Sequence, residues 1–170
     1  MLDGTTCAGI EVRHLTKDQA IEHFSRTVEG LSEYDVLILS DCESEVLSLF
    51  PFWVPGTPVP RTNRLRAIRD FVKGGGGLLM IGGWSSFSGR FGTAAYYDTP
   101  VEEALPVDCL KGADDRVETP EGVRVKQWVA DHPIMAGIPW DVAPVFEGFN
   151  TVLPNEGSEV LPHTGDEDTE

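Results

Sequence analysis

Short apolar runs alternate with an amphipathic stretch in the first half of the chain. Residues 36–39 (VLIL) and 78–81 (LLMI) are apolar at every position, which is typical of strands buried on both faces, as in parallel sheets covered by helices. Between them, after Thr62 or Asn63, apolar residues recur at helical spacing up to a run of glycines at 74–77. Strand, helix and strand in this order predict a right-handed βαβ unit.

A different pattern precedes this unit. Residues 9–15 (GIEVRHL) alternate apolar and polar side chains, which predicts a half-exposed strand. Thr16 followed by Gln19 is the signature of a capping box, and apolar residues then recur at steps of three and four. We therefore expect one amphipathic helix that begins after Thr16, ends near Gly30 and packs on the sheet.

The second half of the chain changes in character. A cap at Thr99 with Pro100 at the first helical position predicts a short helix to about Leu105. Beyond it, short strand-like segments are separated by turns such as Pro120-Glu121-Gly122, and they favour an antiparallel extension. The expected strands are residues 107–110, 116–119, 123–129 and 151–153.

The composition fits one folded α/β domain. Of the 170 residues, 41% are hydrophobic and 24% are charged, as in ordinary globular proteins. We expect a single domain over residues 1–165 and an acidic tail at 166–170. No apolar run reaches the roughly 20 residues that a membrane-spanning helix needs, and the first residues lack the pattern of a secretory signal. A cytoplasmic location is therefore expected.

The charge excludes several classes of partner. The 13 basic and 28 acidic residues give a net charge of −15, which argues against binding to nucleic acid or to an anionic membrane. The same acidity, with only four lysines, suits a salt-rich cytoplasm. This halophile hypothesis predicts a lower melting temperature in dilute buffer than in molar salt, whereas an ordinary acidic protein melts equally in both.

The cysteines indicate neither a disulfide framework nor a metal site. Cys7, Cys42 and Cys109 are odd in number, widely spaced and outside any CxxC arrangement, so no metal and no cofactor are expected. Cys42 follows a strand, where activated thiols occur. Its neighbours Asp41 and Glu43 raise the pKa of a thiol, however, so a structural or incidental Cys42 is favoured.

Two polar strand ends form the main candidate site. Ligands of open α/β sheets bind beyond the carboxyl ends of the strands, so Asp41 should lie near the segment that begins with Gly82 and Gly83. Paired glycines permit positive φ and a close backbone approach, and their amides can receive an oxyanion or a carboxylate. Asp41 can accept a hydrogen bond from a hydroxyl. The alternative is a tight turn that binds no ligand.

The residues after the glycines extend this site. Trp84 can form a stacking wall, and Ser85 and Ser86 can donate hydrogen bonds. The segment lacks the last glycine of a G-x-S-x-G nucleophile elbow, where Phe87 stands instead. Ser85 and His132 are the remaining catalytic candidates. The alternatives are that Ser85 bonds to backbone and that His132 orients a loop.

An ordered series of motifs resembles a known family. The series consists of YDVLILSD, RLRAIRDFVKGGGGLLMIGGWSSFSG, YYDTPVEEALPV, DDRVETPEG, DHPIMAGIP and GFN. It resembles the putative glutamine amidotransferase family of the class I glutamine amidotransferase-like superfamily, to which trehalose-utilisation-type proteins are related. The resemblance covers residues 9–163. It implies a flavodoxin-like three-layer sandwich with a mostly parallel sheet. Compared with the family pattern, we expect this sequence to lack an N-terminal strand and further C-terminal strands.

This sequence departs from the superfamily pattern at the position of the nucleophile. Class I amidotransferases carry a cysteine in the turn after the strand that resembles LLMI, with a His-Glu pair later in the chain. Here Gly82, Gly83 and Trp84 occupy that turn. We therefore expect a domain that binds a small polar metabolite, either a sugar or an amino-acid-like compound. The alternatives are a hydrolase or amidotransferase with another nucleophile, and a noncatalytic assembly module that forms a homo-oligomer.

Overall fold

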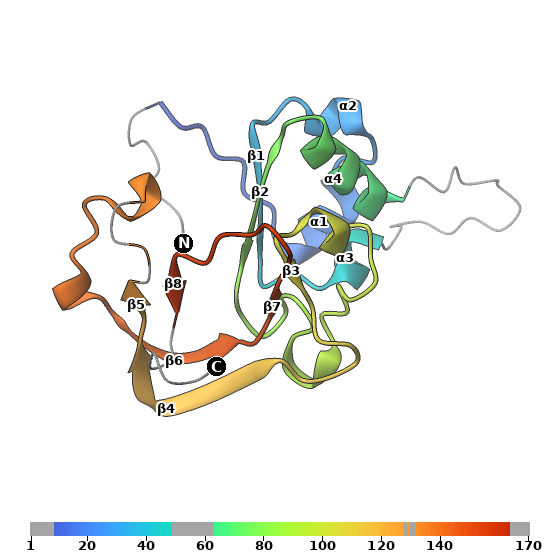
Figure 1. Cartoon of the computed structure of the whole chain (residues 1–170). Helices are drawn as coiled ribbons and strands as arrows, with labels where there is room; N and C mark the ends of the chain where they lie inside the picture. The colour runs from blue at the N-terminus through green and yellow to red at the C-terminus, as the bar shows by residue number, and fades with distance from the viewer. Residues whose placement is uncertain (1–8, 49–62, 128, 130–131, 164–170) are drawn as a thin grey trace, which may run out of the picture.

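The computed structural model describes residues 9–48, 63–127, 129 and 132–163 (Figure 1). The helices are α1 (Lys17–His23), α2 (Val28–Leu31), α3 (Ser44–Ser48) and α4 (Arg64–Lys73). The strands are β1 (Val36–Ser40), β2 (Gly77–Ile81), β3 (Val107–Asp108), β4 (Arg116–Arg124), β5 (Lys126–Gln127), β6 (Val145–Asn150), β7 (Leu153–Pro154) and β8 (Pro162–His163). Single turns of 3₁₀ helix are η1 (Arg90–Gly92), η2 (Glu102–Ala104), η3 (Pro133–Met135) and η4 (Trp140–Val142). None of the described helices is long and apolar enough to cross a membrane.

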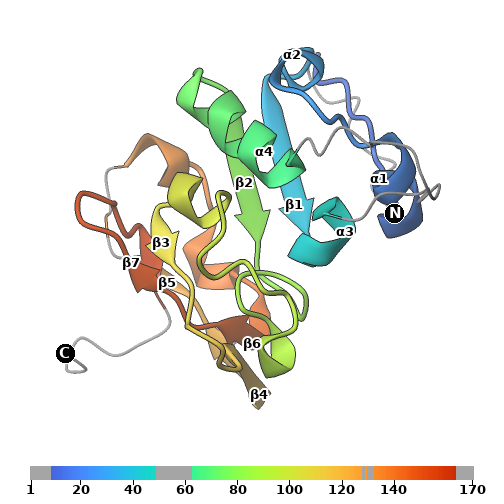
Figure 2. The same cartoon turned by 90° about the vertical axis from the view of Figure 1, so that its right-hand side faces the viewer.

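The predicted strand, helix and parallel strand are present. β1 and β2 pair in parallel, and α4 connects them. Asn63 caps α4, since its side chain accepts hydrogen bonds from two amides of the first turn. Figures 1 and 2 show α2 and α4 on the same side of the two strands. Leu37 and Leu39 of β1 pack there against Ile68 and Phe71 of α4, and this cluster forms the main core.

The opposite face of β1 and β2 is open in the described part of the chain. Burial along β1 alternates, with Val36 and Ile38 53% and 56% exposed, and Leu79 and Ile81 of β2 are 49% and 45% exposed. The prediction that both strands are buried on both faces is therefore wrong for the described residues. The physical reason is that the described helices contact only one face, so every second side chain remains in solvent.

The N-terminal segment differs from its prediction. Residues 9–15 form no strand, and Ile10 and Val12 are 64% and 44% exposed. Alternating side chains produce a strand only where a neighbouring strand can take the backbone hydrogen bonds, and no described strand pairs with this segment.

The helix expected after Thr16 is divided in two. The capping box of Thr16 and Gln19 is present at the start of α1. The helix stops after His23, where Ser25 donates a hydrogen bond to the carbonyl oxygen of Thr27 and thereby competes with helical bonding. Thr27 then caps the separate helix α2.

The antiparallel extension is confirmed, although its strands differ in detail. Three pairs, β3 with β7, β4 with β6 and β5 with β8, are all antiparallel. The predicted turn Pro120-Glu121-Gly122 lies inside β4, where the register shifts between Glu118 and Val123, so it is an irregularity of one strand. Strands β6 and β8 and helix α3 were not predicted. Residues 49–62 and the predicted acidic tail lie outside the described residues.

Candidate functional site

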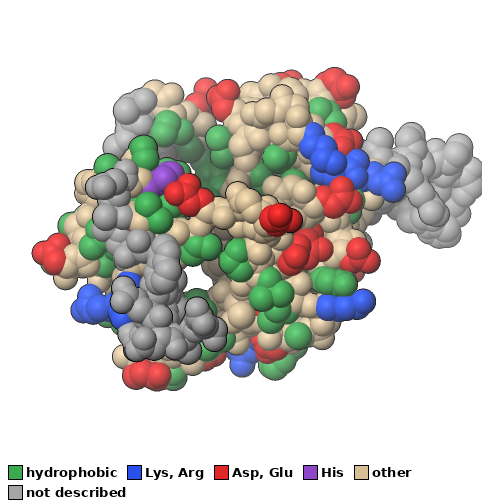
Figure 3. All heavy atoms as spheres, in the orientation of Figure 1, with side chains coloured by type: hydrophobic (Ala, Val, Ile, Leu, Met, Phe, Trp, Pro, Cys, Tyr) green, Lys and Arg blue, Asp and Glu red, His purple; other side chains and the backbone are tan. Residues whose placement is uncertain are grey.

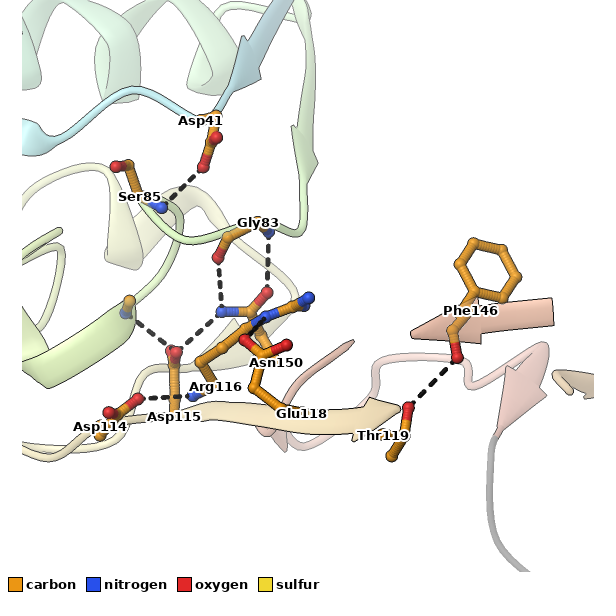
Figure 4. A network of polar contacts seen from close by, with 11 residues as sticks. Asp41, Gly83, Ser85, Asp114, Asp115, Arg116, Glu118, Thr119, Phe146 and Asn150 are labelled. Atoms are coloured by element: carbon orange, nitrogen blue, oxygen red, sulfur yellow. Dashed lines mark hydrogen bonds and ion pairs between the residues drawn. The ribbon is translucent and has the colours of Figure 1, made fainter. Parts of the chain in front are cut away.

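The carboxyl ends of β1 and β2 lie together, as parallel pairing requires. Asp41 follows β1, and its Oδ1 accepts a hydrogen bond of 2.7 Å from the backbone N–H of Ser85, in the segment after β2 (Figure 4). Asp41 has a φ of 51°, a left-handed conformation that aspartate tolerates better than most residues. The backbone turn at Asp41 therefore directs its carboxylate toward the segment after β2.

The two glycines are needed for close approach and not for positive φ. Neither Gly82 nor Gly83 is among the residues with positive φ, so that part of the prediction is wrong. A Cβ atom at Gly83 would lie 2.6 Å from Oδ1 of Asp41, and one at Gly82 would lie 3.0 Å from Oδ1 of Asn150. The side chains of Asp41 and Asn150 thus lie so close to the glycine backbone that they leave little room for a larger residue.

Asn150, the last residue of β6, holds the peptide groups of Gly83. Its Oδ1 accepts a hydrogen bond of 2.8 Å from the Gly83 N–H, and its Nδ2 donates one of 3.0 Å to the Gly83 carbonyl oxygen. Figure 4 shows Gly83 between Asp41 and Asn150. The Gly83 amide is therefore already bonded, and a ligand oxyanion would have to replace Asn150 there. Sequence reasoning missed this residue, although it stands in the motif GFN.

A buried carboxylate completes the network. Asp115 is 1% exposed and accepts hydrogen bonds from the backbone N–H groups of Ser88 and Gly89 at 2.7 and 2.9 Å. It also accepts a bond of 2.8 Å from Nδ2 of Asn150. Three donors satisfy the buried charge. Sequence reasoning assigned no role to Asp115, and its only signal was its place in the motif DDRVETPEG.

Ser85 is bonded to a carboxylate through its hydroxyl. Its Oγ donates to Oε1 of Glu43 at 2.6 Å, and Lys17 donates to the same oxygen at 2.8 Å. Partial burial opposes ionisation of Glu43, but the hydrogen bonds from Lys17 and Ser85 outweigh it and lower the pKa of this carboxyl below its usual value. Glu43 is therefore ionised at neutral pH and is a poor general base for Ser85.

Trp84 and Ser86 have different environments. Trp84 is 52% exposed, and the guanidinium of Arg90 lies 4.3 Å from its ring centroid, a cation–π contact that leaves part of the ring in solvent. Ser86 is buried and donates a hydrogen bond of 2.6 Å to the carbonyl oxygen of Ile81. In this structure Ser86 therefore supports the turn, while Trp84 is available at the surface.

His132 lies in the C-terminal part and makes no hydrogen bond to Ser85. It caps η3, with its Nδ1 accepting from the N–H of Ile134 at 3.2 Å, and its Nε2 is 3.6 Å from a carboxylate oxygen of Glu159. The two catalytic candidates are thus not brought together into a nucleophile and base pair.

The described thiols are unsuited to thiolate chemistry. Burial, followed by the nearby Glu43, raises the pKa of Cys42 to about 11. Burial, followed by the charge of Glu102, raises the pKa of Cys109 to about 12. Among the described residues, no group of three or more His, Cys, Asp or Glu side chains is placed to hold a metal ion.

Left-handed backbone conformations are concentrated around the strand ends. Among the described residues, the non-glycine residues with positive φ are Asp41, Phe87, Phe91, Ala95 and Asp98. Four of these five lie within residues 82–98, which follow β2, and the fifth, Asp41, accepts a hydrogen bond from Ser85 in that stretch. Such conformations persist only where the surrounding structure determines them, and they cluster at functional sites. The surrounding structure therefore fixes the backbone conformation of these residues, as at functional sites.

The fold and this site define a class of α/β protein with a candidate ligand site at the carboxyl ends of parallel strands. A family model described as "Putative glutamine amidotransferase" matches residues 1–169, so the chain belongs to that family. A comparison with curated proteins finds none that matches the chain.

Two solved structures are similar over most of the chain. Cytoplasmic Protein STM3548 from Salmonella typhimurium has 34% sequence identity and a TM-score of 0.83, and the match covers 91% of this chain and 61% of that one. Cytoplasmic Protein STM1381 from Salmonella typhimurium LT2 has 34% identity and a TM-score of 0.82, with coverage of 92% and 62%. The chain therefore spans about three fifths of the length of these two proteins.

Proposed function

We propose that this glutamine amidotransferase-like domain binds a small, neutral, hydroxyl-rich metabolite, such as a sugar, where β1 and β2 end. The observation that carries the proposal is the exposed ring of Trp84 on a segment that is fixed in shape and flanked by the carboxylates of Asp41 and Glu43. The two similar Salmonella proteins are described as cytoplasmic, which supports a cytoplasmic location for this chain. The parallel β1–β2 pair joined by α4 supports part of the flavodoxin-like arrangement that the resemblance implies, although the other three described strand pairs are antiparallel.

The chemistry of the site favours hydroxyl groups over anions. Each of the carboxylates of Asp41 and Glu43 uses one oxygen in its described hydrogen bonds, which leaves the second oxygen to accept from a ligand. A sugar supplies such donors, and its apolar ring face packs on an indole. Acidic side chains are spread over the surface in Figure 3, and the net charge is −15, so the field of the protein disfavours an anionic ligand.

The same geometry gives little support to hydrolysis or glutamine amide transfer. Ser85 has an ionised carboxylate as its hydroxyl partner, and Cys42 and Cys109 remain protonated thiols at neutral pH. An activated nucleophile needs a nearby base or a lowered pKa. We therefore propose that the site binds a ligand and does not catalyse these reactions.

A thermal-shift screen with glucose, trehalose, gluconate and glutamine tests the proposal. A ligand at about 100 times its dissociation constant stabilises the folded state by about 2.7 kcal/mol. We expect glucose or trehalose to raise the melting temperature, and Trp84→Ala to abolish the rise. Phe91→Ala is the matched control, because Phe91 is also exposed and also contacts Arg90. A shift by glutamine alone would favour the amidotransferase alternative.

The second candidate function is an assembly module that pairs two copies of this chain. The open face of β1 and β2 favours it, because a parallel sheet is normally covered on both faces. Sedimentation equilibrium tests it: we expect a dimer that Ile38→Asp dissociates, whereas Ile134→Asp, at another exposed isoleucine, leaves it intact. A monomer at every concentration would contradict this candidate.

A further inference from the structure

We propose that Asn150 and Asp115 are positioning residues. They hold residues 83–89, the segment that carries Trp84 and Ser85, in its binding conformation, from the side opposite to Asp41. This inference rests on the proposed function, since it assigns how the site is kept in shape. Both residues belong to the antiparallel part of the chain: Asn150 ends β6, and Asp115 directly precedes β4.

Asn150 binds the start of the segment through both groups of its amide. Its Oδ1 accepts from the Gly83 N–H at 2.8 Å and its Nδ2 donates to the Gly83 carbonyl oxygen at 3.0 Å. A side-chain amide that satisfies the N–H and the carbonyl of one residue fixes the orientation of both flanking peptide groups. The peptide bond between Gly83 and Trp84 is one of these, so Asn150 sets the direction in which Trp84 leaves the turn.

Asp115 fixes the orientation of Asn150 and the end of the segment. Nδ2 of Asn150 donates to Oδ1 of Asp115 at 2.8 Å, and an amide turned the other way would place two oxygens against each other. The same carboxylate holds the N–H groups of Ser88 and Gly89 at 2.7 and 2.9 Å. The segment is thus attached to this pair at both ends.

The ligand-facing residues lie between the two attachment points. Trp84 and Ser85 follow Gly83 and precede Ser88. Their backbone makes two described hydrogen bonds: the Ser85 N–H donates to Asp41, and the Trp84 carbonyl oxygen accepts from the Arg90 N–H at 2.9 Å. Asn150 and Asp115 form hydrogen bonds to the segment on one side, and Asp41 forms one on the other side (Figure 4). If Asn150 is removed, the segment loses one of its restraints, and we expect the hydrogen bond from the Ser85 N–H to Asp41 to open more often.

Amide hydrogen exchange of the full chain, measured by NMR, tests this coupling. In Asn150→Ala we expect exchange at least about tenfold faster at Gly83, which loses its own acceptor, and also at Ser85, whose acceptor Asp41 is unchanged. The matched control is Asn155→Ala, which removes an asparagine that donates to the carbonyl oxygen of Leu105. Unchanged exchange in the core strand β1 shows that the variants remain folded.

The effect at Ser85 separates positioning from a purely local role. Faster exchange at Gly83 alone would overturn the proposal, because the loss of one local bond does not move an amide held by Asp41. In a parallel titration with trehalose, we expect Asn150→Ala to bind at least about tenfold more weakly and Asn155→Ala to bind as the unaltered chain does. If the unaltered chain binds no sugar, the proposed function fails, while the exchange result still decides the positioning role.

Discussion

The helical half of the molecule, residues 9–81, and the antiparallel half differ in the interactions that stabilise them. In the helical half, α2, α3 and α4 pack on one face of β1 and β2, and side chains such as Ile68 are completely buried. In the antiparallel half, residues 107–163, three strand pairs leave many large apolar side chains exposed, and the least exposed described residue is the charged Asp115. The comparison indicates that apolar packing stabilises the first half, whereas the second half contributes polar contacts that shape the candidate site.

A matched pair of leucine substitutions gives the largest expected effect. Leu39 of β1 is 6% exposed and belongs to the core, while Leu153 of β7 is 54% exposed. We expect Leu39→Ala to lower the free energy of unfolding by about 2–5 kcal/mol and Leu153→Ala to lower it by less than about 1 kcal/mol. Urea denaturation measures both. Equal losses would mean that the two halves do not differ in how they are stabilised.

Thiol reactivity compares burial in the two halves. An ordinary thiol has a pKa of 9.0, and that of Cys42 is raised to about 11, so its thiolate fraction at pH 8 is about a hundredfold smaller. We expect slow alkylation of Cys42 by iodoacetamide at pH 8, with a rate that increases tenfold per pH unit up to about pH 10. Cys109, in the antiparallel half, has a pKa of about 12, so we expect its alkylation at pH 8 to be about tenfold slower than that of Cys42. Peptide mass spectrometry reports each site, and rapid labelling of Cys42 at pH 8 would contradict its raised pKa.

Capping at α1 gives a smaller effect. The side chain of Thr16 accepts from the N–H of Gln19, and Gln19 reaches back to the N–H of Thr16. We expect Thr16→Ala to cost about 1 kcal/mol of stability in urea denaturation. Thr93→Ala is the control, because its hydroxyl donates to a carbonyl in an exposed turn and caps no helix start. A loss no greater than that of the control would show that α1 does not depend on its cap.

The ion pair of Glu43 and Lys17 gives the smallest effect and a pH dependence of known sign. The pKa of Glu43 is lower in the folded state than its ordinary value of 4.5. Ionised Glu43 therefore stabilises the fold above this pH, and the contribution is lost as pH falls through the folded-state pKa. We expect Glu43→Gln to be less stable than the unaltered chain at pH 7, by under about 1 kcal/mol. This difference should shrink as the pH falls below 4.5, and a difference that did not change with pH would contradict the role of the charge.

Much of the helical half could be predicted from the sequence because its signals are local. The cap at Asn63, the apolar spacing of α4 and the runs of β1 and β2 each depend on neighbouring residues, and all of them appear in the structure. Residues 9–15 show the limit of such signals, since a strand also needs a partner edge that no local pattern reveals. The open face of β1 escaped prediction for a related reason: an apolar run does not tell which faces are covered.

The candidate site was predictable only in part. That Asp41 meets the segment after Gly82 and Gly83 follows from parallel pairing of strand ends. The roles of Asn150 and Asp115 depend on contacts 67 and 27 residues away in the chain, to Gly83 and Ser88, so spacing within a motif could not reveal them. The predicted close approach to the backbone of the two glycines is present, with Asp41 and Asn150 as the neighbours, whereas the positive φ that was also predicted is absent.

The most direct test of the proposed binding site is the change in backbone amide NMR shifts when trehalose or glucose is added to the full chain. The account predicts shifts concentrated at Asp41 and at Gly83 to Ser86, with few changes at the open face of β1 and β2. Shifts confined to another surface, or none at saturating sugar, would contradict it.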